Sequence, residues 1–318
     1  MPLLAAAIPL LLAAGCMLLR PGSTTRAAYV GSDACISCHE SRHPQIVRAW
    51  RGSRHHATMQ RVDADGLRPQ LGSDCAANGE RLLAVIGRPG GRHVLVRPDL
   101  RIVPSRGWEE DELFPPHDVI AAPRNSVDAG EQCLGCHSTG YFVAQRACVE
   151  PGVGCEACHG PGRRHAETGG SKERIVNPAR LPRARGNMVC GQCHSAGADR
   201  SGKHPFPVVR AGSSLAPFRP GQDLATGFVD ARPKLARKGW EYSSFAQASE
   251  AYSNQSCTDC HDPHGRPAHP SMLKDPTNEI CLRCHGVGRA RLRFQNHGAV
   301  GDVTKKTCWA CHRNAHAH

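Results

Sequence analysis

Between positions 133 and 159 the chain twice reads Cys-x-x-Cys-His, first as Cys133-Leu134-Gly135-Cys136-His137 and then as Cys155-Glu156-Ala157-Cys158-His159. The same pentad occurs five more times, at Cys35–His39, Cys190–His194, Cys257–His261, Cys281–His285 and Cys308–His312. This pentad is the attachment signature of c-type haem, in which both thiols bond to the porphyrin and the histidine ligates the iron. Zinc knuckles also use Cys-x-x-Cys pairs, but zinc does not need a histidine directly after every second cysteine. The sequence therefore predicts seven covalently attached haems c.

Each pentad supplies two attachment residues and one proximal iron ligand. The predicted attachment residues are the pentad cysteines: Cys35, Cys38, Cys133, Cys136, Cys155, Cys158, Cys190, Cys193, Cys257, Cys260, Cys281, Cys284, Cys308 and Cys311. The predicted proximal ligands are the pentad histidines: His39, His137, His159, His194, His261, His285 and His312.

The composition predicts an interior that is built around the haems. Only 5% of the 318 residues are aromatic, whereas 33 are glycine and 24 are proline. Such a chain has few large apolar side chains with which to exclude water, so porphyrin faces should supply the missing apolar surface. We expect a mainly α fold with long irregular loops and a haem-packed core. A small β-hairpin insert is expected near residues 80–100, with strands at 82–86 and 93–96.

The pentads divide the chain into consecutive regions. Residues 1–28 are expected to be a signal peptide or lipoprotein signal, and residues 29–130 a first-haem region with the hairpin insert. In that region a helical pattern ends near Gly52, and the insert should shield the first haem or present a docking face. Residues 131–200 would hold haems two to four. Residues 201–256 read as a linker without a core of its own and then a helix over 244–253. Residues 257–318 would hold haems five to seven.

The first 19 residues are almost all apolar and predict export. Leu12-Ala13-Ala14-Gly15-Cys16 resembles a lipobox, in which a lipidated Cys16 would attach the protein to a membrane. Cleavage near Ala27 or Ala28 and retention as an N-terminal anchor are the alternatives. The expected location is periplasmic or at the cell surface, where disulfides persist. A Cys75–Cys148 bridge is then one prediction, and two buried thiols are the other.

The formal charge of +12 does not indicate a nucleic-acid partner. Fourteen haem propionates would offset most of this charge, and the sequence has no basic patch interleaved with aromatic residues. The excess of lysine and arginine is more simply explained by propionate partners and a solvated surface.

Several further segments together resemble one family. They are Tyr29-Val30-Gly31-Ser32, Trp50 with Ser53-x-His55, Cys136-His137-Ser138-Thr139-Gly140-Tyr141, Gly152–Gly162 around the third pentad, Cys190-Gly191-Gln192-Cys193-His194-Ser195, and Phe245–Ser249 leading to Cys257–His264. In these segments the chain is similar to multihaem cytochromes c of the cytochrome c-554-like branch. The resemblance implies a secreted bacterial electron-transfer protein with bis-histidine haems in closely packed pairs. It names no partner, and the region 200–243 matches weakly.

Twelve histidines outside the pentads could fill the second axial positions, and bis-histidine ligation suits low-spin electron-transfer haems. By resemblance, His55 fits the family's Ser-x-His position, His165 the histidine after Gly-Pro-Gly, and His264 the Asp-Pro-His position. His297 fits a placement shortly before the last pentad. The further candidates are His117, His204 and His316. We expect ordinary roles for His43, His56, His93, His269 and His318.

We expect an electron carrier rather than an enzyme: a heptahaem cytochrome that passes electrons between redox partner proteins in an extracytoplasmic respiratory chain. One alternative is a multihaem reductase or oxidoreductase of a nitrogen or sulfur oxyanion, which needs one open haem site. Many such enzymes carry a Cys-x-x-Cys-Lys pentad, and none occurs here. The other alternative is a haem subunit of a larger respiratory or cell-surface conduit complex.

Overall fold

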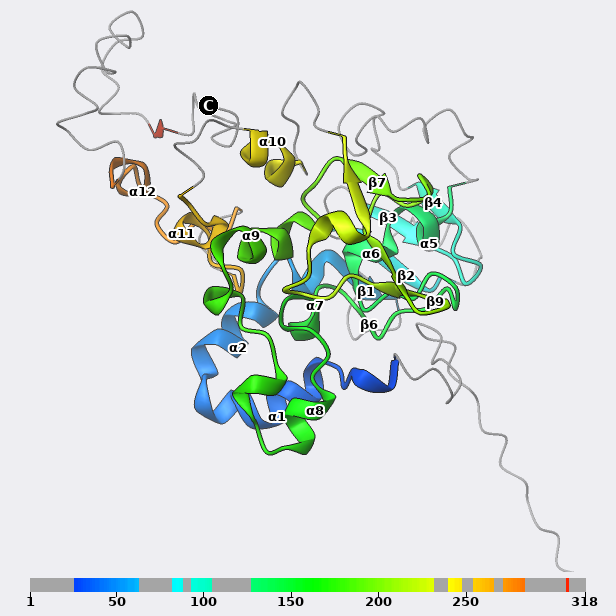
Figure 1. Ribbon diagram of the computed structural model, residues 1–318, viewed down its shortest axis with the longest axis horizontal. Helices are drawn as coiled ribbons and strands as arrows, with labels where there is room; N and C mark the ends of the chain where they lie inside the picture. The colour runs from blue at the N-terminus through cyan, green and yellow to red at the C-terminus, as the bar shows by residue number, and fades with distance from the viewer. Residues whose placement is uncertain are drawn as a thin grey trace, which may run out of the picture.

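The computed structural model describes residues 26–62, 82–87, 93–104, 127–231, 240–247, 254–265, 271–283 and 307–308. Figure 1 shows a group of short helices on one side, with a small sheet on the other. Within these ranges no helix is both long enough and apolar enough to span a membrane. Residues 1–25, which hold most of the expected signal and Cys16, lie outside the described part.

Short helices carry the pentads. The first lies inside α1 (Ser32–Arg42), the second in α6 (Leu134–His137), the third in α7 (Cys155–His159), and the fourth at the end of α9 (Arg183–Gly191). The fifth begins α11 (Cys257–Cys260), and Cys281 of the sixth lies in α12 (Glu279–Leu282). The other α-helices of the described ranges are α2 (Pro44–Arg51), α5 (Ala129–Gln132), α8 (Arg163–Glu167) and α10 (Glu241–Gln247). Because α2 ends with Gly52 as its C-cap, the helix expected before Gly52 is confirmed.

The expected hairpin is present as part of a larger sheet. Strands β2 (Ala84–Gly87) and β3 (His93–Val96) pair antiparallel, with Ala84 opposite Val96. Strands β1 (Met59–Arg61) and β4 (Ile102–Pro104) extend this sheet in the order β1-β2-β3-β4. Successive side chains along β2 and β3 point to opposite faces of the sheet, and nearly all of them are buried. Other side chains therefore pack against both faces of this sheet.

The main hydrophobic cluster joins this sheet to the second pentad. Sheet residues such as Met59 and Val96 pack with Cys133 and Leu134, which are almost completely buried. The described part of the insert thus covers the second pentad rather than the first. Cys148 belongs to the same cluster and is disulfide-bonded, as the expected bridge requires, while Cys75 lies outside the described residues.

Residues 201–231 differ from the linker that the sequence suggested. Here β8 (Val208–Ala211) pairs with β9 (Ser214–Pro217), and β10 (Phe228–Asp230) pairs with β7 (Gly197–Asp199). Phe218, Leu224 and Phe228 form a buried cluster of their own. Glycine and proline marked these turns correctly, but three apolar residues spaced along an irregular chain give no periodic signal. Helix α10 also begins earlier than expected, at Glu241.

Buried carboxylates connect the N-terminal segment to the third pentad. Glu156, inside the pentad and 2% exposed, accepts hydrogen bonds from the backbone N–H groups of Val30, Gly31 and Gly162. Glu150, in the short strand β6 (Glu150–Pro151) that pairs with β5 (Ser138–Thr139), accepts from the backbone and hydroxyl of Ser32. These bonds place the start of α1 against α7.

Candidate haem sites

A single helical turn arranges the functional groups of each described pentad. The backbone N–H of the pentad histidine bonds to the carbonyl of the first cysteine, with N···O distances of 3.0 Å in the second and fourth pentads and 2.9 Å in the fifth. Residues four apart lie on one face of a helix. The turn therefore presents the two thiols and the imidazole to the same side, as attachment to one flat macrocycle requires.

Thiols of different pentads meet one another. Cys35 is hydrogen-bonded to Cys155, and this contact raises the pKa of the Cys35 thiol and lowers that of Cys155 to about 7. Cys136 is likewise bonded to Cys193, and Cys190 to Cys257. The amide of Gln192, inside the fourth pentad, also donates to the carbonyl of Ala157, inside the third, at 3.0 Å. The first pentad is thus next to the third, and the fourth is next to the second, third and fifth.

Three pentad histidines face a histidine from a distant part of the chain. The ring centres are 6.1 Å apart for His39 and His165, 6.2 Å for His159 and His264, and 6.4 Å for His194 and His55. Metal–imidazole bonds are ~2 Å long, and a ring centre lies ~1 Å behind its nitrogen, so two imidazoles on one metal have centres ~6 Å apart. All three spacings therefore fit a single iron between the rings.

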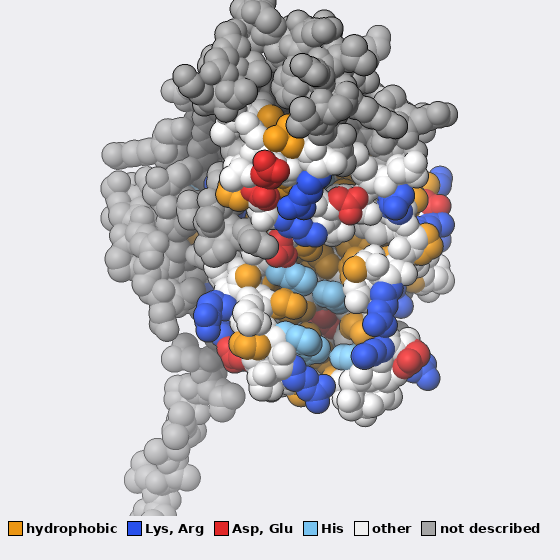
Figure 2. Space-filling view, turned by 90° about the vertical axis from the view of Figure 1, so that its left-hand side faces the viewer, with side chains coloured by type: hydrophobic (Ala, Val, Ile, Leu, Met, Phe, Trp, Pro, Cys, Tyr) orange, Lys and Arg blue, Asp and Glu red, His pale blue; other side chains and the backbone are white. Residues whose placement is uncertain are grey.

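Histidines gather in a hollow on one face of the described surface, with lysine and arginine side chains around its rim (Figure 2). A cavity beside His159 is lined by several arginines, among them Arg164, Arg174 and Arg219. Cationic side chains at the edge of a haem cleft are suited to haem propionates, because guanidinium groups pair well with carboxylates.

Six of the candidate ligand histidines have a hydrogen-bond partner at Nδ1, the ring nitrogen that would face away from the metal. The Nδ1 atoms of His159, His165, His55 and His261 contact the backbone carbonyls of Val176 (2.8 Å), Ser171 (2.9 Å), Pro263 (3.0 Å) and Ser271 (2.8 Å). His137 Nδ1 contacts the hydroxyl of Thr58 at 2.8 Å, and His194 Nδ1 contacts Glu241 Oε2 at 3.0 Å. Such partners fix a ring so that Nε2 points at the metal.

Burial acts on the protonation of these rings. It lowers the pKa of His39, His55, His137 and His159, and so favours the neutral imidazole that binds metal. At His194 burial also lowers the pKa, but the hydrogen bond and charge of Glu241 outweigh it and the pKa is raised.

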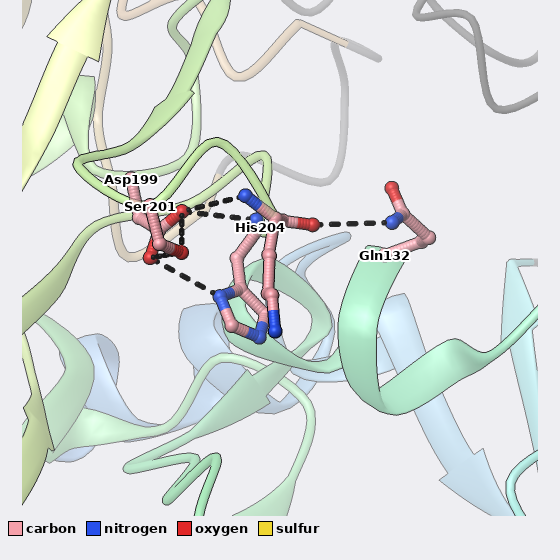
Figure 3. Close-up of polar contacts among 5 residues, drawn as sticks. Gln132, Asp199, Ser201 and His204 are labelled. Atoms are coloured by element: carbon pink, nitrogen blue, oxygen red, sulfur yellow. Dashed lines mark hydrogen bonds and ion pairs between the residues drawn. The ribbon is translucent and has the colours of Figure 1, made fainter.

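His204 is positioned by a compact turn rather than by a facing histidine (Figure 3). The buried carboxylate of Asp199 accepts from the backbone N–H groups of Lys203 and His204 and from the hydroxyl of Ser201. Its Oδ2 lies 3.3 Å from His204 Nδ1, and the His204 ring packs on Phe206 at 5.2 Å. Gln132 at the end of α5 donates to the carbonyl of Lys203, so this turn rests against the helix before the second pentad.

Other sequence-predicted residues lie outside the described part: Cys284, His285, Cys311, His312, His117, His297 and His316. Among the residues that are described, no three His, Cys, Asp or Glu side chains converge on a common point as a structural zinc site would require. The partners Thr58 and Glu241 carried no sequence signal, since they are far from the pentads they contact.

Comparisons with known proteins match two parts of the chain. Residues 116–160 match the family model of cytochrome c554 and c-prime, and residues 250–290 match the doubled CXXCH motif. The chain is a multihaem c-type cytochrome. As in other proteins of this class, haem c is covalently bound through the pentads. No curated protein matches the cytochrome significantly.

Two solved structures align with the cytochrome, and one of them resembles it in fold. The outer cell wall cytochrome OcwA is 22% identical, with a TM-score of 0.57 over 81% of this chain and 67% of its own. An undecahaem cytochrome from the S-layer of Carboxydothermus ferrireducens is 20% identical, with a TM-score of 0.48 over 83% of this chain and 44% of its own.

Proposed function

We propose that this cytochrome is an exported electron carrier with seven haems, mostly ligated by two histidines, that passes single electrons between redox partner proteins. Bound haem supplies iron that changes oxidation state by one electron; the chain holds, orients and shields it. The observation that carries the proposal is the set of three histidine pairs with ring centres about 6 Å apart, each joining a pentad to a distant segment.

We assign these facing histidines as second axial ligands: His165 to the first haem, His264 to the third and His55 to the fourth. Two strong-field imidazoles give low-spin iron, which changes geometry little between oxidation states and suits electron transfer. His117, His204, His297 and His316 remain the candidates for the other four haems.

The first haem has two nearby histidines, and their positions favour His165. The ring of His43 lies 5.7 Å from that of His39, closer than that of His165. However, His43 follows His39 by one helical turn, so the backbone of that turn would collide with a porphyrin placed between the rings. His165 comes from α8 (Arg163–Glu167), which lies beside α1 (Figure 1), so the two rings belong to separate helices and no shared helical turn joins them.

The contacts between pentads support a continuous electron path. Thiols that touch become thioether sulfurs at the edges of neighbouring haems, so haem one would adjoin haem three, and haem four would adjoin haems two and five. The Gln192–Ala157 bond joins the third and fourth pentads and connects the two groups. Haem four is then the junction among the first five haems.

An extracytoplasmic location follows from the predicted export signal and agrees with the outer cell wall cytochrome as a structural neighbour. Lipidation of Cys16 remains a proposal, as does membership of a larger complex. Mass spectrometry of the mature N-terminus distinguishes a lipidated Cys16 from cleavage near Ala27 or Ala28.

A potentiometric titration of the purified holoprotein followed by EPR tests the function. The expected result is low-spin ferric haem in most sites, reduced reversibly in one-electron steps. Substantial high-spin haem that binds cyanide or nitrite rapidly would contradict the electron-carrier proposal and favour an enzyme with an open haem site.

A further inference from the structure

The fourth pentad differs from the second, third and fifth pentads in the group that holds its histidine. His159 and His261 use backbone carbonyls and His137 uses a hydroxyl, all uncharged, whereas His194 uses the carboxylate of Glu241 at 3.0 Å. A carboxylate draws the Nδ1 proton toward itself and gives the imidazole more anionic character. Such a ring is a stronger donor to the metal, and donor strength and nearby hydrogen bonds set the potential of an iron site.

Glu241 is held over His194 by the way α10 docks. The N–H of Tyr242 donates to the carbonyl of His194 at 2.8 Å, and the hydroxyl of Ser243 accepts from the N–H of Ala196 at 2.9 Å. The same hydroxyl donates to Asp230 at 2.8 Å. The two residues that follow Glu241 are thus bonded to His194, Ala196 and Asp230, and these bonds hold the first turn of α10 beside the His194 ring.

The contact between α10 and the fourth pentad is also close. A Cβ atom at Gly191, inside the pentad, would come within 2.9 Å of the Tyr242 ring, so only glycine permits this approach. Trp240, directly before α10, is 7% exposed. The Glu241 side chain is 32% exposed, so water screens its charge incompletely.

We propose that Glu241 is a positioning residue that acts through His194 and makes the reduction potential of the fourth haem more negative. A negative charge and a more basic ligand both stabilise the ferric ion relative to the ferrous ion. The fourth haem is the proposed junction of haems two, three and five. Glu241 would therefore set the reduction potential of the haem through which every electron passes between those three haems. This inference rests on the proposed ligation by His194.

The test compares Glu241→Gln with the parent holoprotein by EPR-monitored redox titration. Glutamine keeps the shape and an acceptor oxygen but removes the charge. One midpoint potential is expected to move in the positive direction, with a change in the low-spin EPR signal of that same haem, while the other potentials and the haem content stay unchanged. Glu131→Gln is the matched control, because it removes an exposed carboxylate that also lies close to a pentad.

Unchanged potentials in Glu241→Gln, or a shift equal to that in Glu131→Gln, would overturn the inference while leaving the electron-carrier function intact. If Glu241→Gln protein fails to take up its haems, Glu241→Asp carries the test, because it keeps the charge but shortens the reach. It is expected to move the same potential in the same direction by a smaller amount, and no movement counts against the inference. Loss of the proposed function shows separately, as high-spin haem in the parent protein.

Discussion

Replacing Glu156 with glutamine should weaken the connection between the N-terminal segment and the third pentad. The two carboxylate oxygens accept from three backbone N–H groups: Oε1 from Val30 (3.0 Å) and Gly162 (2.6 Å), and Oε2 from Gly31 (2.7 Å). Glutamine has one acceptor oxygen, so in either orientation its amide NH₂ faces a backbone N–H. At least one donor then loses its partner in a site where the side chain is 2% exposed.

The cost can be estimated from these contacts. A hydrogen bond to a charged group contributes about 1.5–3 kcal/mol, and a buried donor without a partner costs about 1–3 kcal/mol. Relief from burying the charge offsets part of this loss, because a buried carboxylate is poorly solvated. We therefore expect Glu156→Gln to lower the free energy of unfolding by about 2–4 kcal/mol.

Guanidinium denaturation of the holoprotein, followed by tryptophan fluorescence and far-UV circular dichroism, measures this change. Glu167→Gln is the control, because the Glu167 side chain is 61% exposed and its ion pair with Arg163 is at the surface. Surface changes of this kind usually alter stability by less than about 0.5 kcal/mol. Equal stabilities for the two variants would refute the reasoning.

Three other predictions concern the haem sites and their surroundings. His165→Ala should convert one low-spin haem to high-spin in the EPR spectrum, whereas His43→Ala should not; the reverse would show that His43 is the ligand of the first haem. Gly135→Ala should destabilise the protein by about 1–3 kcal/mol, because the new Cβ would overlap the ring of Phe206. In thermal denaturation, adding Phe206→Leu should restore part of the lost stability, and a double variant less stable than Gly135→Ala would contradict this prediction. Burial raises the pKa of Glu150 above 4.5, so the folded state binds this proton more tightly than the unfolded state does. The free energy of unfolding should therefore fall as pH rises from 4.5 to the raised pKa. Glu150→Gln should flatten this pH dependence, and an unchanged slope would show that another group is responsible.

The sequence was sufficient for the features that depend on near neighbours. Pentad spacing identified a multihaem c-type cytochrome, and two short apolar segments on either side of a Pro-Gly-Gly turn predicted the β2–β3 hairpin. A helical pattern ending near Gly52 did the same for α2. These signals work because a helical turn or a two-stranded hairpin is determined within a few residues.

Contacts between distant segments could not be predicted in this way. Val30 lies 126 positions from Glu156, and His55 lies 208 positions from Pro263, so no spacing rule connects them. Glu241 lies before the helix expected over 244–253, and its contact with His194 depends on how α10 docks on the fourth pentad. The hydrophobic cluster of Phe218, Leu224 and Phe228 was missed for a similar reason, since its members come from separate short segments.

The most direct test of the account is mass spectrometry of the denatured holoprotein together with peptide mapping of each Cys-x-x-Cys-His segment. Because thioether bonds survive denaturation, the account predicts a polypeptide heavier by seven haem groups, with one haem on each pentad peptide. A mass showing fewer haems, with free thiols or zinc at some pentads, would contradict it.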